Sequence, residues 1–202
     1  MAAALPPYTV PALDRLFQLS ILNIRQTSSG YNGSNYTVLT EEGEVLMNLN
    51  EVVPDSWLRG GAKRPFLFDG VDTMGNKLFS FSRDAGMLLV STKVELFMSV
   101  GLVSIIRAEH HFFTPIFRIN DAQDNPVMRL KSQASDFSFF QLQTNDKTAI
   151  GAVQKKFRGW KKELSSFKDD YVINFPADLA VTYKLAVIVA CVFIDFGFHE
   201  GK

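Results

Sequence analysis

Ten consecutive apolar residues near the C-terminus constrain this chain more than any other feature. The run LAVIVACVFI extends from Leu185 to Ile194, between the charged residues Lys184 and Asp195. As a helix it is only ~15 Å long, whereas the hydrocarbon core of a bilayer is ~30 Å thick. A longer span would place both charges at membrane depth, at about 2.5 kcal/mol or more each. We therefore predict a helix buried in the protein, with a membrane-spanning helix as the alternative.

This helix is expected at about residues 179–196, within a single domain of residues 13–202 that follows a short tail of residues 1–12. Pro176 disfavours helix before it and Asp178 is a preferred N-cap, so the helix should begin at Leu179. The β-branched residues would also suit a buried strand, but length and the cap favour a helix. Its apolar surface should comprise Leu185, Val187, Ile188, Val189, Val192, Phe193 and Ile194.

Composition limits the classes of partner and site. The chain has 202 residues, and 21 basic residues balance 21 acidic ones, so no global field favours nucleic acid. The single cysteine excludes an internal disulfide framework and a cysteine-based zinc site, and indicates a reducing compartment. The first ten residues, MAAALPPYTV, do not resemble a secretory signal. The 18 phenylalanines suit the interior of a barrel or sandwich.

Strand-like segments fill most of the chain before the predicted helix. After Leu16, the alternation of Phe17, Leu19, Ile21 and Ile24 favours a strand. Four later segments repeat a strand, a turn and a strand, and together with residues 86–109 they predict about ten to twelve strands. Their turns are expected at Glu42-Gly43, Met74-Gly75-Asn76, Asp124-Asn125 and Asn145-Asp146. We expect a mainly β antiparallel barrel or sandwich, most economically a sheet closed around the C-terminal helix.

Several segments resemble the phospholipid scramblase family, from about Leu13 to the C-terminus. The most specific are Arg64-Pro65-Phe66, the Phe175–Leu179 turn and Ile194-Asp195-Phe196. The resemblance implies a tubby-like fold, a closed antiparallel barrel of about twelve strands around a hydrophobic C-terminal helix. It also implies calcium-responsive, ATP-independent, bidirectional movement of phospholipids between membrane leaflets, with calcium as the cofactor.

The sequence departs from the better-known family pattern in three ways. It does not show the long proline-rich N-terminal tail, so the SH3 and WW ligands of that tail are not expected. The segment SWLRGGAKRPF contains no cysteine cluster for palmitoyl chains. In the segment proposed to bind calcium, Phe167 stands where the family pattern begins with Asp.

The segment SFKDDYVINFPAD carries the predicted calcium ligands. Calcium takes about six to eight oxygen ligands, so backbone carbonyls and water would complete the shell. The segment has no glycine and no distal Glu, and is therefore not an EF-hand loop. The alternative is structural, with Asp178 as an N-cap and the first two aspartates in a solvated turn. The predicted ligands are Asp169, Asp170, Asn174 and Asp178.

The segment QKKFRGWKK interleaves basic and aromatic residues. Each basic residue near an anionic lipid surface contributes about 1 kcal/mol, and Trp and Phe suit the interfacial zone. A solvated strand pair with inward aromatics is the alternative, and a nuclear-import or nucleic-acid patch is a weaker one because the net charge is zero. The predicted lipid-surface residues are Lys155, Lys156, Phe157, Arg158, Trp160, Lys161 and Lys162.

No catalytic constellation stands out, so we expect a lipid translocator and not an enzyme. The adjacent His110 and His111 would face opposite sides of a strand, and Cys191 lies within the apolar run. Asp195 opposes the helix dipole and should be held by a barrel Arg or Lys, with a headgroup role as the alternative.

The rival function is a non-transporting tubby-like module that binds anionic lipids or proteins in signalling or regulation. Expected partners are phospholipid membranes and anionic lipids, with protein partners or a homo-oligomer as further options, and nucleic acid is not expected. The expected location is the cytoplasmic face of a membrane, first the plasma membrane, with mitochondrial or nuclear pools left open.

Overall fold

The computed structural model describes residues 10–28, 33–52, 65–84, 93–109, 114–133, 137–156 and 170–198. The two helices in these ranges are α1 (Pro11–Gln18) and α2 (Val181–Phe198). The strands are β1 (Ile21–Ser28), β2 (Asn35–Leu39), β3 (Val45–Glu51), β4 (Phe66–Val71), β5 (Lys77–Arg83), β6 (Lys93–Met98), β7 (Gly101–Glu109), β8 (Ile116–Asn120), β9 (Pro126–Ser132), β10 (Phe139–Thr144), β11 (Ala149–Lys156) and β12 (Asp170–Asn174).

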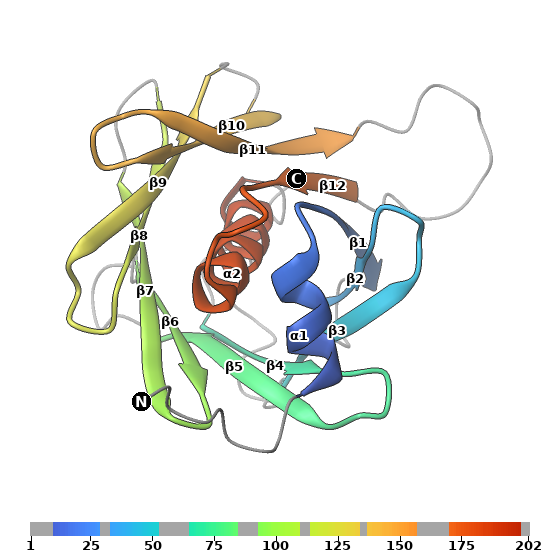
Figure 1. The fold of residues 1–202 in the computed structure, drawn as a ribbon. Helices are drawn as coiled ribbons and strands as arrows, with labels where there is room; N and C mark the ends of the chain where they lie inside the picture. The colour runs from blue at the N-terminus through green and yellow to red at the C-terminus, as the bar shows by residue number, and fades with distance from the viewer. Residues whose placement is uncertain are drawn as a thin grey trace, which may run out of the picture.

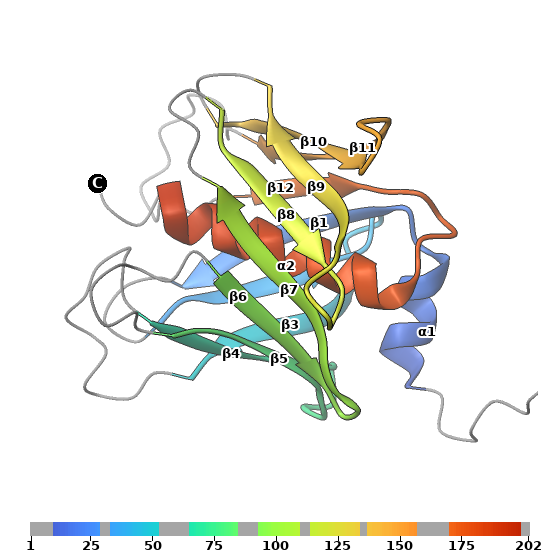
Figure 2. The same ribbon diagram turned by 90° about the vertical axis from the view of Figure 1, so that its left-hand side faces the viewer.

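The twelve strands form one closed antiparallel barrel in which neighbours in sequence are neighbours in the sheet. Pairing of β1 with both β2 and β12 closes the ring. Helix α2 lies inside the ring (Figure 1) and runs along the length of the barrel (Figure 2). This confirms the predicted fold, a closed barrel of about twelve strands around the C-terminal helix.

The four predicted hairpins share one turn geometry, in which the fourth residue of the loop has a positive φ. In the β2–β3 turn, the amide of Thr40 donates to the carbonyl of Glu44 and the amide of Gly43 donates to Thr40. The same two backbone bonds recur in the other three turns. A type I turn followed by a left-handed residue is a common solution for short hairpin loops. The left-handed residues are Gly43, Gly75, Asp124 and Lys147.

Helix α2 is the centre of the core. Every residue of its predicted apolar surface is buried, and the most exposed of them, Phe193, is only 3% exposed. Aromatic rings from the strands surround it. The ring of Phe117 packs edge-on against that of Phe193, with 5.4 Å between ring centroids, and the ring centroids of Phe66 and Phe196 are 4.9 Å apart. The core-helix prediction is confirmed. Among the described residues, no helix combines the length and apolar character needed to cross a membrane.

Helix α1 is a feature that the sequence reading missed. Residues 11–18 form a helix, and the strand expected after Leu16 begins only at Ile21. Pro11 occupies the first turn, where its fixed φ suits a helix and its missing N–H is not needed. Leu13 and Leu16, three residues apart, both face the core. The apolar spacing in this segment is therefore helical, and α1 lies at the barrel end where α2 begins (Figure 2).

Helix α2 begins two residues later than predicted, and Asp178 does not cap it. A turn closed by the amide of Leu179 and the carbonyl of Pro176 comes first. The carbonyl of Ala180 then accepts from the amide of Lys184, the first helical hydrogen bond. Ala180 therefore occupies the capping position, and the exposed Asp178 lies in the preceding turn.

The buried Lys184 joins the two helices. Its Nζ donates to the carbonyls of Phe17 (2.6 Å), Leu19 (2.7 Å) and Ala177 (2.8 Å), and a fourth carbonyl, that of Leu16, lies at 3.2 Å. Several of these carbonyls belong to the C-terminal end of α1, where helical carbonyls need partners and a positive charge is favourable. Burial lowers the pKa of Lys184, while the charge of Asp178 acts in the opposite direction.

The enclosure of α2 predicts the effect of a charge at its centre. Ala190 is fully buried, so Ala190→Arg should cost several kcal/mol and unfold a domain whose stability is about 5–15 kcal/mol. Ala149→Arg, at an exposed position of β11, is the matched control and should fold normally. Circular dichroism during thermal unfolding measures both, and a folded Ala190→Arg protein would contradict the enclosure of α2.

The contacts of Lys184 predict that Lys184→Met weakens the attachment of α1. The methionine fills similar space but donates no hydrogen bond, and unsatisfied buried carbonyls should cost about 3 kcal/mol. Urea unfolding should show this loss, and hydrogen exchange should show faster exchange in α1. Lys156→Met, at an exposed position, is the control. Unchanged exchange in α1 would contradict the role given to Lys184.

Candidate functional site

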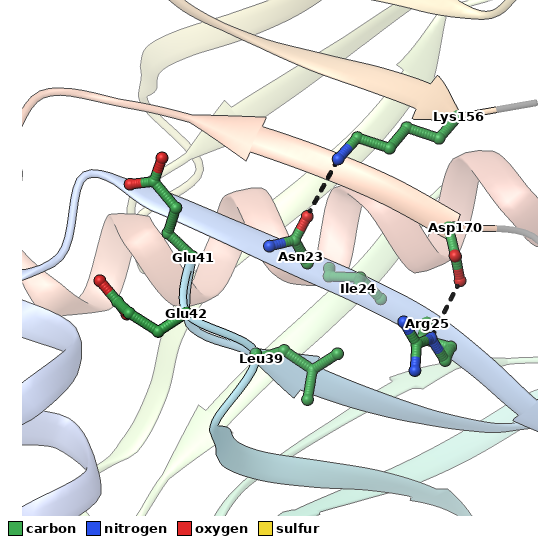
Figure 3. Close-up of a pocket in the computed structure, with 9 residues that line it drawn as sticks. Asn23, Ile24, Arg25, Leu39, Glu41, Glu42, Lys156 and Asp170 are labelled. Atoms are coloured by element: carbon green, nitrogen blue, oxygen red, sulfur yellow. Dashed lines mark hydrogen bonds and ion pairs between the residues drawn. The ribbon is translucent and has the colours of Figure 1, made fainter.

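Closure of the barrel between β1 and β12 creates a polar groove on its outer surface. The groove has a volume of about 280 Å³ and lies where β1, β11 and β12 run beside the β2–β3 turn (Figure 3). Its charged residues come from distant parts of the sequence, which the sheet brings together. The groove is lined by Asn23, Ile24, Arg25, Leu39, Glu41, Glu42, Gly43, Lys156 and Asp170.

One end of the groove is mainly basic. Lys156, Asp170 and Arg25 lie directly opposite one another in three neighbouring strands, so a carboxylate stands between two cations. Arg25 Nε donates to Asp170 Oδ1 at 3.4 Å, and Lys156 Nζ donates to Asn23 Oδ1 at 3.5 Å. Both contacts are long, and the Arg25 side chain is 49% exposed. Both cations therefore keep donors that a bound ligand can use.

The other end of the groove is acidic. Glu41 and Glu42 form the tip of the β2–β3 turn, and their carboxylates lie beyond Asn23 from the Arg25–Asp170 pair (Figure 3). Asn23 fixes this turn to β1, because its Nδ2 donates to the carbonyl of Thr40 at 3.2 Å. A hydrogen bond with the Thr40 side chain lowers the pKa of Glu42, so the Glu42 carboxyl group is ionised at neutral pH.

The groove thus separates positive and negative groups across one asparagine. Lys156 and Arg25 can donate to a phosphate or carboxylate, and the glutamates can accept from an amine.

The strand alternation corrects one predicted lipid-surface residue. Lys155 points into the barrel and is only 8% exposed, with Nζ 5.7 Å from the ring centre of Tyr171. Successive residues of a strand face opposite sides, so Lys156 is the exposed member of the pair. The other predicted members, Phe157, Arg158, Trp160, Lys161 and Lys162, lie outside the described residues.

The predicted calcium ligands are not brought together as one site. Asp170 and Asn174 occupy opposite ends of β12, about 13 Å apart at ~3.3 Å per residue, too far to share one ion. Asp178 lies in the turn before α2, and Asp169 is outside the described residues. In the described part of the chain, no group of three or more His, Cys, Asp or Glu side chains is placed to hold a metal ion. Calcium binding stays a prediction.

Asp195 has hydrogen-bond partners that the sequence did not indicate. It is buried, and its two oxygens accept from the hydroxyls of Tyr171 and Tyr36, both at 2.7 Å. Burial, followed by the nearby Asp195 carboxylate, raises the pKa of Cys191 well above its ordinary value. The cysteine is therefore a protonated core thiol, as expected from its place in the apolar run.

The residues that define the groove were missed for a physical reason. Asn23 and Arg25 are outward-facing positions of β1, and Glu41 and Glu42 resemble any hairpin turn. The available signal was the run of acidic residues in the turn and the polar residues at alternate positions of β1. Only the pairing of β1 with β2 and β12 places these groups beside Lys156 and Asp170.

A second charged surface lies across β6 to β9, where four cations stand opposite one another in register. Like charges in this arrangement destabilise a sheet. Carboxylates offset three of these cations. Glu95 pairs with Lys93, Asp124 pairs with Arg107, and Glu109 pairs with Arg118. The fourth cation, Arg129, donates a hydrogen bond to Gln143 at 2.9 Å. The row is largely compensated and is a weaker candidate than the groove. Its cations are Lys93, Arg107, Arg118 and Arg129.

Comparison with known proteins assigns the chain to a family. A family model described as Scramblase matches residues 13–201. The chain belongs to the scramblase family. It is 28% identical to phospholipid scramblase 2 of Bos taurus, an alignment that covers 99% of this chain and 75% of that protein. It is 25% identical to phospholipid scramblase 1 of Homo sapiens, with 100% and 70% covered.

A solved structure supports the fold of this scramblase-family chain. A crystal structure of a protein from Arabidopsis thaliana matches it with a TM-score of 0.54 and covers 91% of this chain and 96% of that one. The two are 11% identical, so the likeness concerns the fold alone.

The compensated row predicts a pH-dependent stability. Hydrogen bonds from Arg107, and then from Asn120, lower the pKa of Asp124 to about 2. This is below the value of about 3.9 for an unfolded aspartate, so the stabilisation is present above pH ~4 and lost as the pH falls towards 2. Asp124→Asn should therefore reduce the free energy of unfolding at pH 6 much more than at pH 2.5.

Urea unfolding at several pH values measures this difference. Asparagine tolerates the positive φ of 66° at this position, so the substitution removes charge without new backbone strain. Asp84→Asn, at an exposed position, controls for the loss of one negative charge. A difference that does not change with pH would contradict the role of the Arg107–Asp124 pair.

Proposed function

We propose that this scramblase-family protein binds phospholipid at the cytoplasmic face of a membrane and moves it between leaflets without ATP, in response to calcium. The observation that carries the proposal is the family match over residues 13–201. Two relatives that align with almost the whole chain are named phospholipid scramblases.

The groove supports the lipid-binding part of this proposal. It presents cations for a phosphate on the outer surface of the barrel, where a headgroup can reach them. Lys156 is itself one of the predicted lipid-surface residues, and the predicted members among residues 157–162 follow it directly in the chain. The groove and that segment are therefore adjacent in the chain.

A second candidate is a lipid-binding module that moves no lipid. The observation that favours it is the burial of α2, because the apolar surface of this helix is already used inside the barrel. Such a protein would bind a membrane through its outer surface and leave leaflet asymmetry unchanged.

Reconstitution into liposomes separates the two functions. Phospholipid with a fluorescent headgroup and an impermeant quencher report movement between leaflets, with and without calcium. We expect calcium-stimulated movement above protein-free vesicles, and none with the Ala190→Arg variant. Membrane binding without movement at any calcium concentration would favour the binding module, and equal movement with and without calcium would remove the calcium response.

A further inference from the structure

We infer that the groove between β1, β12 and the β2–β3 turn binds a phosphate ester that carries a primary ammonium group, as in ethanolamine and serine phospholipids. This inference rests on the proposed function and names the headgroup chemistry of its site. Figure 3 shows the separation of charge that carries it: Arg25 lies toward one end and the two glutamates toward the other, and the Lys156 ammonium reaches Asn23 between them.

The charges of the groove disfavour ligands of a single sign. The lining holds two cations and three carboxylates. A purely anionic ligand would bind Arg25 and Lys156 but would be repelled by Glu41 and Glu42. A ligand with only an amine would bind the glutamates but leave the two cations without an anionic partner. A ligand with a phosphate at one end and an ammonium at the other matches both ends of the groove.

The contacts within the groove leave capacity for such a ligand. Arg25 uses one N–H toward Asp170 at 3.4 Å, and the guanidinium carries five. Lys156 has only the 3.5 Å contact to Asn23, among the described residues. A phosphate that accepts from both cations would replace long contacts with charge-assisted hydrogen bonds.

The glutamates favour a primary over a quaternary ammonium. A carboxylate accepts hydrogen bonds, and a primary ammonium donates three, whereas a trimethylammonium donates none. Asn23 Nδ2 already donates a hydrogen bond to the carbonyl of Thr40, at the start of the acidic turn. The acidic turn is therefore fixed in place before a ligand binds, which lowers the cost of ordering it.

Titration of the ¹⁵N-labelled protein with small phosphate esters tests the inference by NMR. Phosphoethanolamine should shift the amides of Asn23, Arg25 and Glu42, and should bind about fivefold more tightly than glycerol phosphate, which has no amine, or phosphocholine, which has no N–H donor. Glu41→Gln with Glu42→Gln should remove this preference and leave weak phosphate binding. Arg25→Gln with Lys156→Gln should weaken all three ligands.

A matched control is Glu95→Gln with Glu109→Gln, which removes two carboxylates from β6 and β7; it should lower the stability, because both offset cations in that row, but keep the preference. Equal binding of the three esters, or shifts that map elsewhere, would overturn the inference. Thermal unfolding of each variant shows whether a loss of binding reflects a loss of fold.

Vesicle binding separates a lipid headgroup from a free phosphate ester. Phosphatidylcholine vesicles should bind the protein more tightly when phosphatidylethanolamine is included, and the Glu41→Gln, Glu42→Gln variant should lose this gain. Binding of the soluble ester without any gain on vesicles would overturn the lipid assignment. The transport assay and the binding assay can fail independently. Headgroup binding without lipid movement counts against the proposed transport function alone. Lipid movement without headgroup binding counts against the groove assignment alone.

Discussion

An apolar helix with one charge near each end is the constraint on which the structure depends. Helix α2 is apolar on every side, so it needs a closed wall and not a single packing face. Lys184 and Asp195, about 16 Å apart along the axis at ~1.5 Å per residue, fix its position within that wall. Backbone carbonyls of α1 and of the turn before α2 accept hydrogen bonds from the Lys184 ammonium, and two tyrosine hydroxyls donate to the Asp195 carboxylate. A shift of the helix by one turn would bury both charges without these partners, which is costly. The polar contacts therefore determine the register of a core that apolar packing alone would leave adjustable.

The groove is a consequence of the same closure. The ring is complete only when β1, near the start of the described chain, pairs with β12, directly before α2. That pair aligns Arg25 with Asp170, and the pairing of β12 with β11 adds Lys156. Inside the wall, the next residues along the same strands are Ile24, Tyr171 and Lys155, all buried. One register therefore specifies both the tyrosine that holds Asp195 and the charges of the outer groove. Disruption of the groove's backbone would disturb the core, whereas replacement of its outward side chains need not.

The sequence predicted the parts of the structure that local chemistry determines. The hairpin turns depend on a few adjacent residues, and the core helix on an uninterrupted apolar run. Helix α1 was missed because the alternation of Phe17, Leu19 and Ile21 overlaps its last turn and suggested that the strand begins there. The start of α2 was misplaced because Asp178 is a good cap in isolation, but the turn at Pro176 comes first. Lys155 was grouped with Lys156 by adjacency, although a strand sends neighbours to opposite sides. The groove could not be predicted, because residues about 130 positions apart form it, as in the Lys156–Asn23 contact with a separation of 133.

The position of Lys156 bears on the proposed binding of a lipid headgroup at the outer surface of the barrel. Exposed ion pairs contribute little to folding, so the long contacts of Arg25 and Lys156 are poorly explained as stabilising bridges. The cations across β6 to β9 show the alternative, because three of them have close carboxylate partners that offset repulsion in the sheet. The groove lacks such tight pairing and instead keeps its cations apart from Glu41 and Glu42. Opposite charges that are held at separate positions along one groove are suited to a ligand that carries both signs. Because Asn23 bonds to both Lys156 and the acidic turn, the spacing of the two ends is set by the barrel and not by the ligand.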